Sequence, residues 1–170
     1  TLTYAANTAT RAYGAANPSF GGTVTGFVNG EDQASATTGT LTFSSAAMAS
    51  SPVGNYAIDG SGLTAANYTF VQAAGNATAL TITAAILTVT PVAVSTPYSG
   101  VPLNNATYSQ STANYSITGF QNGETIASAG ITLSGSMAFN GLTTTTVKDV
   151  GAYTQGVGTL GIAPLGEVDP

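Results

Sequence analysis

The chain has 170 residues, of which 43% are hydrophobic but only 5% are charged, and its formal net charge is −5. Arg11 and Lys148 are the only basic residues, which excludes nucleic-acid binding and electrostatic attachment to anionic membranes, because both need several Lys or Arg side chains. Cysteine, histidine and tryptophan are absent, so disulfides and thiolate metal sites are excluded, and the usual general base and strong nucleophile are missing.

The hydrophobic content is enough for a folded core, and no apolar run approaches the ~18 residues that a transmembrane helix needs. No signal peptide stands at the start, which indicates a piece of a longer protein. Solubility then rests on Thr, Ser, Asn and Gln, and Thr is favoured on strand surfaces. A polar surface with few charges is common in extracellular repeat proteins.

Two copies of one pattern follow each other along the chain. Residues 2–4 read LTY and residues 87–89 read LTV, while residues 25–31 read TGFVNGE and residues 118–124 read TGFQNGE. Further matches in the same order are Tyr13-Gly14 with Tyr98-Ser99, Val53-Gly54-Asn55-Tyr56 with Val150-Gly151-Ala152-Tyr153, and Leu63 with Leu160. The preserved order predicts two homologous domains.

We place the first domain at residues 1–84 and the second at residues 85–170, with the linker at residues 83–86. The linker contains no Gly or Pro hinge, so the domains are expected to stack end to end as a stiff rod. The second copy stops shortly after Leu160. It is therefore predicted to lack its final strands and to expose an open sheet edge, which can form an edge-to-edge dimer.

Alternation of apolar and polar residues predicts half-buried strands; these lie at residues 40–43, 68–71, 80–83 and 87–90. Asn29-Gly30 and Asn122-Gly123 are strong turn dipeptides. The best helix candidate, residues 44–51, is too short and Ser-rich for more than one turn. The predicted fold class is all-β, with two tandem β-sandwich-like domains, Ig-like in one version, and the β-grasp type as the alternative for each.

Five separated motifs of the first copy resemble the MBG domain of the YGX type: RAYG at 11–14, NPSF at 17–20, TGFVNGE at 25–31, PVGNY at 52–56 and NYTF at 67–70. These domains occur in tandem in filamentous-haemagglutinin-like bacterial adhesins. The second copy resembles the YDG-type repeat of the same proteins, with Tyr98-Ser99-Gly100 where that repeat has Tyr-Asp-Gly. Residues 119–124 and 149–153 also fit it.

The resemblance implies a structural stalk or repeat module of a large secreted bacterial surface adhesin, with a role in cell adhesion or biofilm and secretion by a two-partner route. Its partners would be neighbouring repeats of the same parent chain. The alternative is a module that binds host or matrix glycans or polysaccharides directly. No ligand-binding residue is carried over from the family, so the ligand site is unknown.

No catalytic or cofactor-binding residue is predicted. A glycosidase needs two facing carboxylates, but Glu31 and Glu124 are repeat-equivalent and fall in different domains. The favoured interpretation is that Glu31 and Glu124 are only solvent-exposed charged residues of the loop that follows a turn. The alternative is a calcium site to which Glu31, Asp32 and Glu124 contribute oxygens together with backbone carbonyls.

Lys148, the repeated tyrosines and four sequons each allow a structural and a functional interpretation. Lys148 is expected to be an exposed strand lysine, with an isopeptide crosslink as the alternative. The tyrosines at repeated motif positions are read as core residues, with stacking on sugars as the alternative; they are Tyr13, Tyr56, Tyr68, Tyr98 and Tyr153. Sequons that arise by chance in an Asn/Thr-rich chain, or serve as glycosylation sites, begin at Asn67, Asn76, Asn105 and Asn114.

Overall fold

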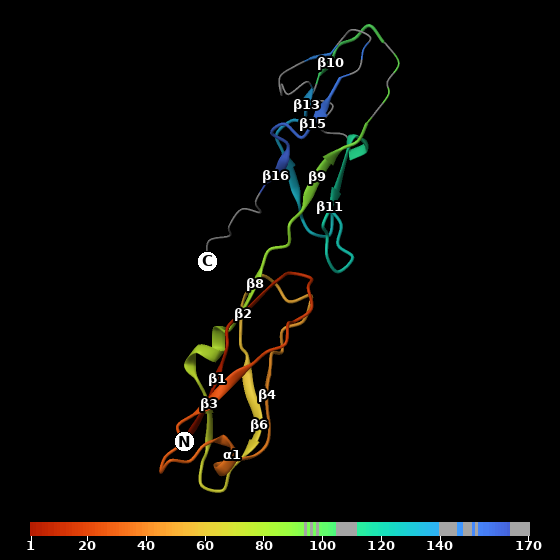
Figure 1. Cartoon of the computed structure of the whole chain (residues 1–170). Helices are drawn as coiled ribbons and strands as arrows, with labels where there is room; N and C mark the ends of the chain where they lie inside the picture. Colours follow the sequence, from red (N-terminus) through yellow and green to blue (C-terminus); the bar gives the residue numbers. More distant parts are fainter. Residues whose placement is uncertain are drawn as a thin grey trace. The chain divides into compact units, whose positions relative to one another are not determined.

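The structure is a computed structural model, which describes residues 1–93, 95, 97, 99–104, 112–139, 146–147, 151 and 153–163. The chain divides into two compact units, which we call unit 1 (Thr1–Ala85) and unit 2 (Ile86–Pro170) (Figure 1). Nearly all regular structure is β, in several small sheets, so the predicted all-β, sandwich-like fold class is confirmed. Of the helices in the described part of the chain, none has the length and apolar content that crossing a membrane requires.

Unit 1 alternates short strands with one turn of α-helix and one 3-10 helix. Its elements are β1 (Leu2–Ala6), β2 (Ala9–Ala12), β3 (Gly22–Thr25), α1 (Gln33–Ala36), β4 (Thr38–Ser44), β5 (Gly54–Tyr56), β6 (Asp59–Thr64), β7 (Phe70–Gln72), η1 (Ala74–Thr78) and β8 (Leu80–Thr83).

The first two strands of unit 1 pair with its last two strands. β1 pairs antiparallel with β3 and parallel with β7, and β2 pairs parallel with β8, which also pairs antiparallel with β5. β4 and β6 form a separate antiparallel pair. Parallel neighbours cannot be joined by a tight hairpin. The chain from β3 to β6 therefore separates the two strands of each parallel pair in the sequence.

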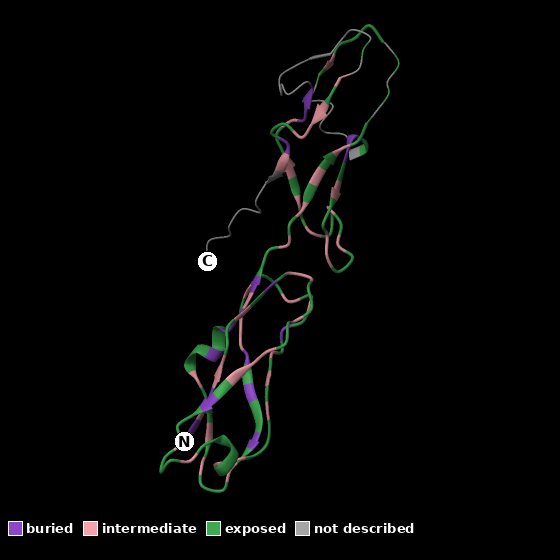
Figure 2. Cartoon of the chain, in the orientation of Figure 1, coloured by how far each residue is buried: buried purple, intermediate pink, exposed green. Residues whose placement is uncertain are grey.

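One cluster of buried side chains joins the β3-β1-β7 sheet to the β4-β6 pair. Leu2 and Tyr4 of β1 are 0% and 4% exposed, and they pack with Val24 of β3 and Leu63 of β6. The ring of Tyr4 stacks on Phe70 of β7 with centroids 5.1 Å apart. Figure 2 colours the buried residues of unit 1 purple along these strands and the neighbouring elements. These contacts give unit 1 its layered packing.

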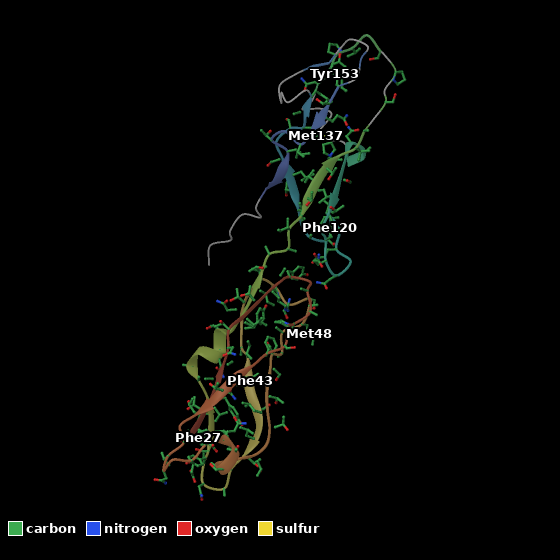
Figure 3. The ribbon with its side chains drawn as sticks, in the orientation of Figure 1. Phe27, Phe43, Met48, Phe120, Met137 and Tyr153 are labelled. Atoms are coloured by element: carbon green, nitrogen blue, oxygen red, sulfur yellow. The ribbon has the colours of Figure 1, made fainter. Side chains whose placement is uncertain are left out.

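A second cluster lies under the β2-β8-β5 sheet. Its buried members are Ala47, Ile58, Ala79, Leu80 and Ile82, of which Ile58 and Leu80 are completely buried. Half-buried aromatic rings, among them Phe43, pack against it. Phe43 contacts both clusters and therefore connects them in the interior of unit 1 (Figure 3).

Unit 2 contains shorter strands. Its elements are β9 (Thr88–Pro91), β10 (Leu103–Asn104), η2 (Thr112–Asn114), β11 (Tyr115–Thr118), β12 (Thr132–Ser134), β13 (Ala138–Phe139), β14 (Thr146–Val147), β15 (Gln155–Gly156) and β16 (Gly161–Ala163). The antiparallel pairs are β9 with β11, β10 with β14, β12 with β16 and β13 with β15. Its core consists of Tyr115, Met137, Phe139 and Leu160.

The repeated sequence folds into the same strand pair in both units. Thr3 faces Thr25 in the β1–β3 pair, and the repeat-equivalent Thr88 faces Thr118 in the β9–β11 pair. The next hydrogen bond is also repeated: Asn7 N–H donates to Gly21 O in unit 1, and Val92 N–H donates to Asn114 O in unit 2, each at 2.8 Å. The β1–β3 and β9–β11 pairs therefore have the same residue register, and the same repeat-equivalent residues form the hydrogen bonds between the strands.

The strand predictions are confirmed at residues 40–43 and 80–83, which lie within β4 and coincide with β8. The strand predicted at 87–90 starts one residue later and includes Pro91. The strand predicted at 68–71 is only partly correct, because β7 begins at Phe70.

The one-turn helix predicted at residues 44–51 is wrong. These residues finish β4 and continue as an irregular segment that ends in a turn. The backbone carbonyls of Ala47 and Met48 accept hydrogen bonds from the side chains of Asn17 and Arg11. Because these carbonyls are bound by long-range side chains and Ala47 is buried in the core, tertiary contacts outweigh the local helix propensity of the alanines. The first helix is instead α1, which the sequence analysis missed.

Candidate functional site

The loop after β3 carries two of the three carboxylates considered as calcium ligands. Gly26 has a φ of 105°, and Asn29 and Gly30 have φ of 57° and 76°, values that favour glycine and asparagine. The N–H of Glu31 donates to Val28 O at 3.1 Å and closes the predicted turn. Glu31 closes this turn, and Asp32 follows it directly.

Glu31 forms a hydrogen bond with a tyrosine from a distant part of the chain. The hydroxyl of Tyr68 donates to Glu31 Oε2 and accepts the N–H of Val28 at 3.2 Å. The Tyr68 ring packs edge-on against Phe27, with centroids 6.0 Å apart. The hydrogen bond to Glu31 raises the pKa of Tyr68 above its usual 10.0, because only the neutral hydroxyl donates. This contact attaches the loop to the segment before β7.

Asp32 caps helix α1. Its Oδ1 accepts the N–H of Ser35 at 2.8 Å, and the N–H of Asp32 donates to Ser35 Oγ at 2.9 Å. This reciprocal pair is a capping box with serine in place of the usual Glu or Gln. The backbone hydrogen bond from Ser35, followed by the bond from its side chain, lowers the pKa of Asp32 below its usual 3.8.

Unit 2 repeats this loop with a neutral cap. Asn122 and Gly123 have φ of 51° and 75°, and Glu124 follows them as Glu31 does in unit 1. The N–H of Thr125 donates to Ser128 Oγ at 2.8 Å, and the N–H of Ser128 donates to Thr125 Oγ1 at 3.2 Å. The reciprocal capping bonds are therefore repeated, with Thr125 at the position of Asp32.

The three calcium candidates are divided between the two units. Glu31 and Glu124 belong to different units, and the oxygens of Glu31 and Asp32 already accept hydrogen bonds from Tyr68 and Ser35. Within the described ranges there is no group of three or more His, Cys, Asp or Glu residues that could hold a metal ion. The structure assigns Glu31 and Asp32 roles in holding the loop, and calcium binding stays a prediction.

The repeated tyrosines pack on the cores of their own units. Tyr13 and Tyr56 contact the Leu80 cluster of unit 1. Tyr153 contacts the Met137 cluster of unit 2; both of these residues are labelled in Figure 3. The Tyr56 hydroxyl also donates to Pro52 O at 2.8 Å. The core interpretation is confirmed for these rings and for Tyr68, which packs with the other unit-1 cluster. Tyr98 and Lys148, the lysine of the isopeptide alternative, lie outside the described residues.

Asn76, in η1, is a buried polar side chain with three hydrogen bonds in unit 1. It is 2% exposed, and its Oδ1 accepts the N–H of Ala6 at 2.8 Å. Its Nδ2 donates to Tyr4 O at 3.0 Å and to Gln72 Oε1 at 2.8 Å. Since η1 interrupts the strand that runs beside β1 and β2, the Asn76 amide takes the place of a missing peptide group in the parallel ladder. Gln72 extends the network to the N–H and C=O of Gly60 in β6.

Arg11 forms a second buried polar group, below the β2-β8-β5 sheet. It is 6% exposed, and its Nε donates to Asn17 Oδ1 at 2.7 Å. Its Nη1 and Nη2 donate to the backbone carbonyls of Ala12 and Met48 at 3.2 Å and 2.5 Å. The guanidinium holds the irregular segment after β4 through its bond to the Met48 carbonyl.

One shallow depression of about 290 Å³ opens between β3 and β4. Its lining residues are Phe20, Gly21, Gly22, Leu41, Thr42 and Phe43. A Cβ at Gly22 would come within 2.3 Å of Ala5 O and 2.5 Å of Phe43 Cζ, so the glycine is required for this close packing. Phe20 and Phe43 are half-buried, and both pack on the core, which limits the ring surface available to a ligand.

A comparison with family models gives one match, the MBG domain (YGX type), over residues 2–78. Residues 2–78 form an MBG domain. MBG domains are repeat modules found in bacterial surface proteins. Searches of curated proteins and of solved structures returned no match. The second unit is compatible with the YDG-type repeat that it resembles.

The matched range of the MBG domain runs from β1 into η1, and it includes Arg11 and Asn76. Sequence analysis treated Asn76 only as the start of a sequon. The amide nitrogen that a glycan would modify is buried and donates two hydrogen bonds, so the folded MBG domain does not present this sequon. Asn114 in unit 2 is also buried, Asn67 is exposed, and Asn105 lies outside the described residues.

Proposed function

We propose that the chain is a structural stalk module of a large secreted bacterial surface adhesin. It extends the parent protein at the cell surface in adhesion and biofilm, and neighbouring repeats of the same parent are its partners. The observation that best supports the proposal is the repetition itself: an MBG domain is followed by a second unit with the same strand register, turn and capping bonds.

The polar side chains of unit 1 support a role without catalysis. Glu31, Asp32, Arg11 and Asn76 are each bound to groups of their own unit. A catalytic site instead needs acid, base or nucleophile groups that are free to reach a substrate. A spacer needs only internal stability and a surface that does not aggregate.

The first test is a glycan and polysaccharide array probed with the full chain. The stalk proposal expects no saturable binding on any spot. Saturable binding would make the chain a lectin-like module and would overturn the proposal. Small-angle scattering on the same sample tests the stiff linker, because a rod gives a narrow distribution of maximum dimensions and a flexible pair a broad one.

Direct glycan binding is the second candidate, and the depression between β3 and β4 is the observation that favours it. Aromatic and aliphatic surface beside the Thr42 hydroxyl suits the face of a sugar ring. If the array shows binding, Leu41→Ala and Phe20→Ala should weaken it. The matched control is Val71→Ala, because Val71 is 46% exposed and does not line the depression.

A further inference from the structure

The loop after β3 carries an asparagine followed directly by a glycine, Asn29-Gly30. Both residues are exposed, and a Cβ built on Gly30 would meet no atom within 4 Å. The turn is closed by the N–H of Glu31, which donates to Val28 O. Within the described residues, no hydrogen bond occupies the side-chain amide of Asn29 or the N–H of Gly30. Both groups are therefore accessible to water and available to react with each other.

Unit 2 repeats this arrangement at Asn122-Gly123. Both residues are exposed, and a Cβ on Gly123 would also meet no atom within 4 Å. The N–H of Glu124 donates to Gln121 O at 2.9 Å and closes the turn as in unit 1. A third pair, Asn140-Gly141, lies outside the described residues. The described part of the chain thus presents an equivalent Asn-Gly turn in each unit.

An exposed Asn-Gly pair can modify itself without an enzyme. The backbone nitrogen of the glycine attacks the side-chain carbon Cγ of the asparagine, a C–N bond forms, and the side-chain nitrogen leaves with the amide proton as ammonia. One water then opens the resulting succinimide ring at either carbonyl, which gives aspartate or isoaspartate. Glycine favours the attack because it has no Cβ to crowd the nitrogen, and neighbouring groups of one chain react without binding a second molecule.

Tyr68 restrains the Asn29-Gly30 turn. Its hydroxyl accepts the N–H of Val28 and donates to the Glu31 carboxylate, so it holds the backbone on both sides of the pair. Ring closure requires the nitrogen of Gly30 to approach Cγ of Asn29, and bonds that fix the flanking backbone make this geometry rarer. In the isoaspartate product, the main chain gains one atom between Val28 and Glu31, so their spacing no longer suits one hydroxyl.

We propose that Asn29-Gly30 is a self-modification site: its conversion to isoaspartate releases the loop from Tyr68, and the Tyr68 hydroxyl sets the rate. Asn122-Gly123 is the equivalent site of unit 2. The reactants are the asparagine side chain, the glycine amide and water, and the change accumulates with the age of the molecule. This inference goes beyond the proposed stalk function, which needs no chemical change in the loop.

The test follows both sites in the full chain during incubation under mildly alkaline conditions, which favour the deprotonated amide nitrogen. Cleavage after aromatic residues separates Asn29, Asn67, Asn122 and Asn140 into different peptides. Mass spectrometry then measures the gain of one mass unit and the isoaspartate fraction in each peptide. We expect Asn29 and Asn122 to convert at least about tenfold faster than Asn67, which is exposed but precedes a tyrosine.

Tyr68→Phe tests the restraint, because it keeps the ring but removes the hydroxyl that binds Val28 and Glu31. The conversion of Asn29 should become about threefold faster or more, because the turn opens more often, while the rate at Asn122 stays the same. Tyr56→Phe is the matched control, since its hydroxyl bonds to the backbone outside this loop, and it should change neither rate.

Glycine variants test the chemistry at each site separately. Gly30→Ala should slow the conversion of Asn29 at least about tenfold by crowding the attacking nitrogen, and it should leave Asn122 unchanged. Gly123→Ala should do the reverse. Hydrogen-exchange protection of the Leu2 amide, which donates to Thr69 O, checks that unit 1 remains folded in every variant.

The release of the loop is measured on the product. Hydrogen exchange at the Val28 amide should be at least about fivefold faster in the isoaspartate form than in the unmodified chain, because the bond to Tyr68 is lost. Asn29→Asp is the matched control. It carries the charge of the other product on a normal main chain, so its Val28 amide should exchange as in the wild type.

Three outcomes would overturn the proposal. One is conversion of Asn29 no faster than that of Asn67. Another is the same rate at Asn29 in the wild type and in Tyr68→Phe. The third is unchanged exchange at the Val28 amide after isoaspartate has formed. Binding on the glycan array bears on the stalk function alone, so the two proposals can fail separately.

Discussion

Units 1 and 2 share one strand pair, one turn and one set of capping bonds, but within the described residues the side chains of their first strands are buried to different degrees. In unit 1, Leu2 and Tyr4 lie under a parallel neighbour and are nearly inaccessible. In unit 2, Leu87 and Val89 are half-buried. The shared features are local in sequence, whereas the parallel neighbour comes from the far end of the unit. The two units therefore share the features that a few neighbouring residues determine.

The comparison predicts that unit 1 is the more stable of the two. Complete burial of a large apolar side chain contributes about 1.5–3 kcal/mol, and unit 1 buries its β1 residues more fully than unit 2 buries those of β9. The free energy of unfolding of each unit can be followed separately by NMR signals in a urea titration. The variants below change the features that distinguish the units, in order of decreasing effect.

Asn76→Ala should give the largest effect. It leaves the buried N–H of Ala6 without its acceptor and removes two donated hydrogen bonds. We expect a loss of about 3 kcal/mol from the free energy of unfolding of unit 1 and none from unit 2. Gly75→Ala is the matched control, because a Cβ there meets no atom within 4 Å. Equal stability of the two variants would contradict the role of Asn76 in the ladder.

Arg11→Met should cost about 2 kcal/mol in unit 1, since it keeps apolar volume but removes the bonds to Asn17, Ala12 and Met48. The N–H of Gly14, which donates to Ala49 O, should lose hydrogen-exchange protection as the segment after β4 loosens. Arg11→Lys should not restore it, because an ammonium group cannot reproduce the planar fork of donors. Full rescue by lysine would show that charge alone matters at this position.

Gly26→Ala and Gly119→Ala test the feature that the units share. Both residues have φ near 105° (105° and 104°), and a Cβ would lie 2.5 Å from Thr1 O or 2.2 Å from Ile86 O. Each substitution should cost about 1–2 kcal/mol, and only in its own unit. Gly30→Ala and Gly123→Ala are milder controls, because their φ is positive but the space around them is empty. An effect in one unit only would break the structural equivalence.

Sequence reasoning predicted the local features well. The Asn-Gly turns at residues 29–30 and 122–123, the strand at 80–83 and the all-β fold class follow from residue preferences that act over a few neighbours. The placement of the tyrosines in the cores also followed, because residues repeated in two copies of a domain meet the same packing demands. Both residue preferences and the repetition of motifs can be recognised from the sequence alone.

The long-range polar contacts could not be predicted from the sequence. Nothing near Asn76 indicates that its amide will replace a peptide group beside Ala6, because that depends on the break in the strand at η1. The helix expected at residues 44–51 failed for the same reason, since Arg11 and Asn17 take its carbonyls from a distance. The α1 cap was missed because the usual pattern has Glu or Gln where this loop has Ser35.

The smallest effect concerns the charge of the two caps. Hydrogen bonds to its carboxylate lower the pKa of Asp32 in the folded protein below the usual 3.8. A lowered folded pKa means that the cap contributes stability above the usual pKa and loses it as the pH falls through the folded pKa. Thr125 does not titrate, so the cap of unit 2 should be insensitive to acid.

NMR titration of the Ser35 and Ser128 amides from about pH 5 to pH 2 measures this difference. The Ser35 amide should shift with a midpoint below 3.8, while the Ser128 amide should stay constant. Asp32→Thr should make the first loop behave like the second. Asp32→Asn keeps a cap oxygen but removes the carboxylate, so the shift of the Ser35 amide should disappear in this variant. A Ser35 midpoint at or above 3.8 would mean that the capping bonds do not favour the charged carboxylate, and the two loops would then differ in sequence but not in electrostatics.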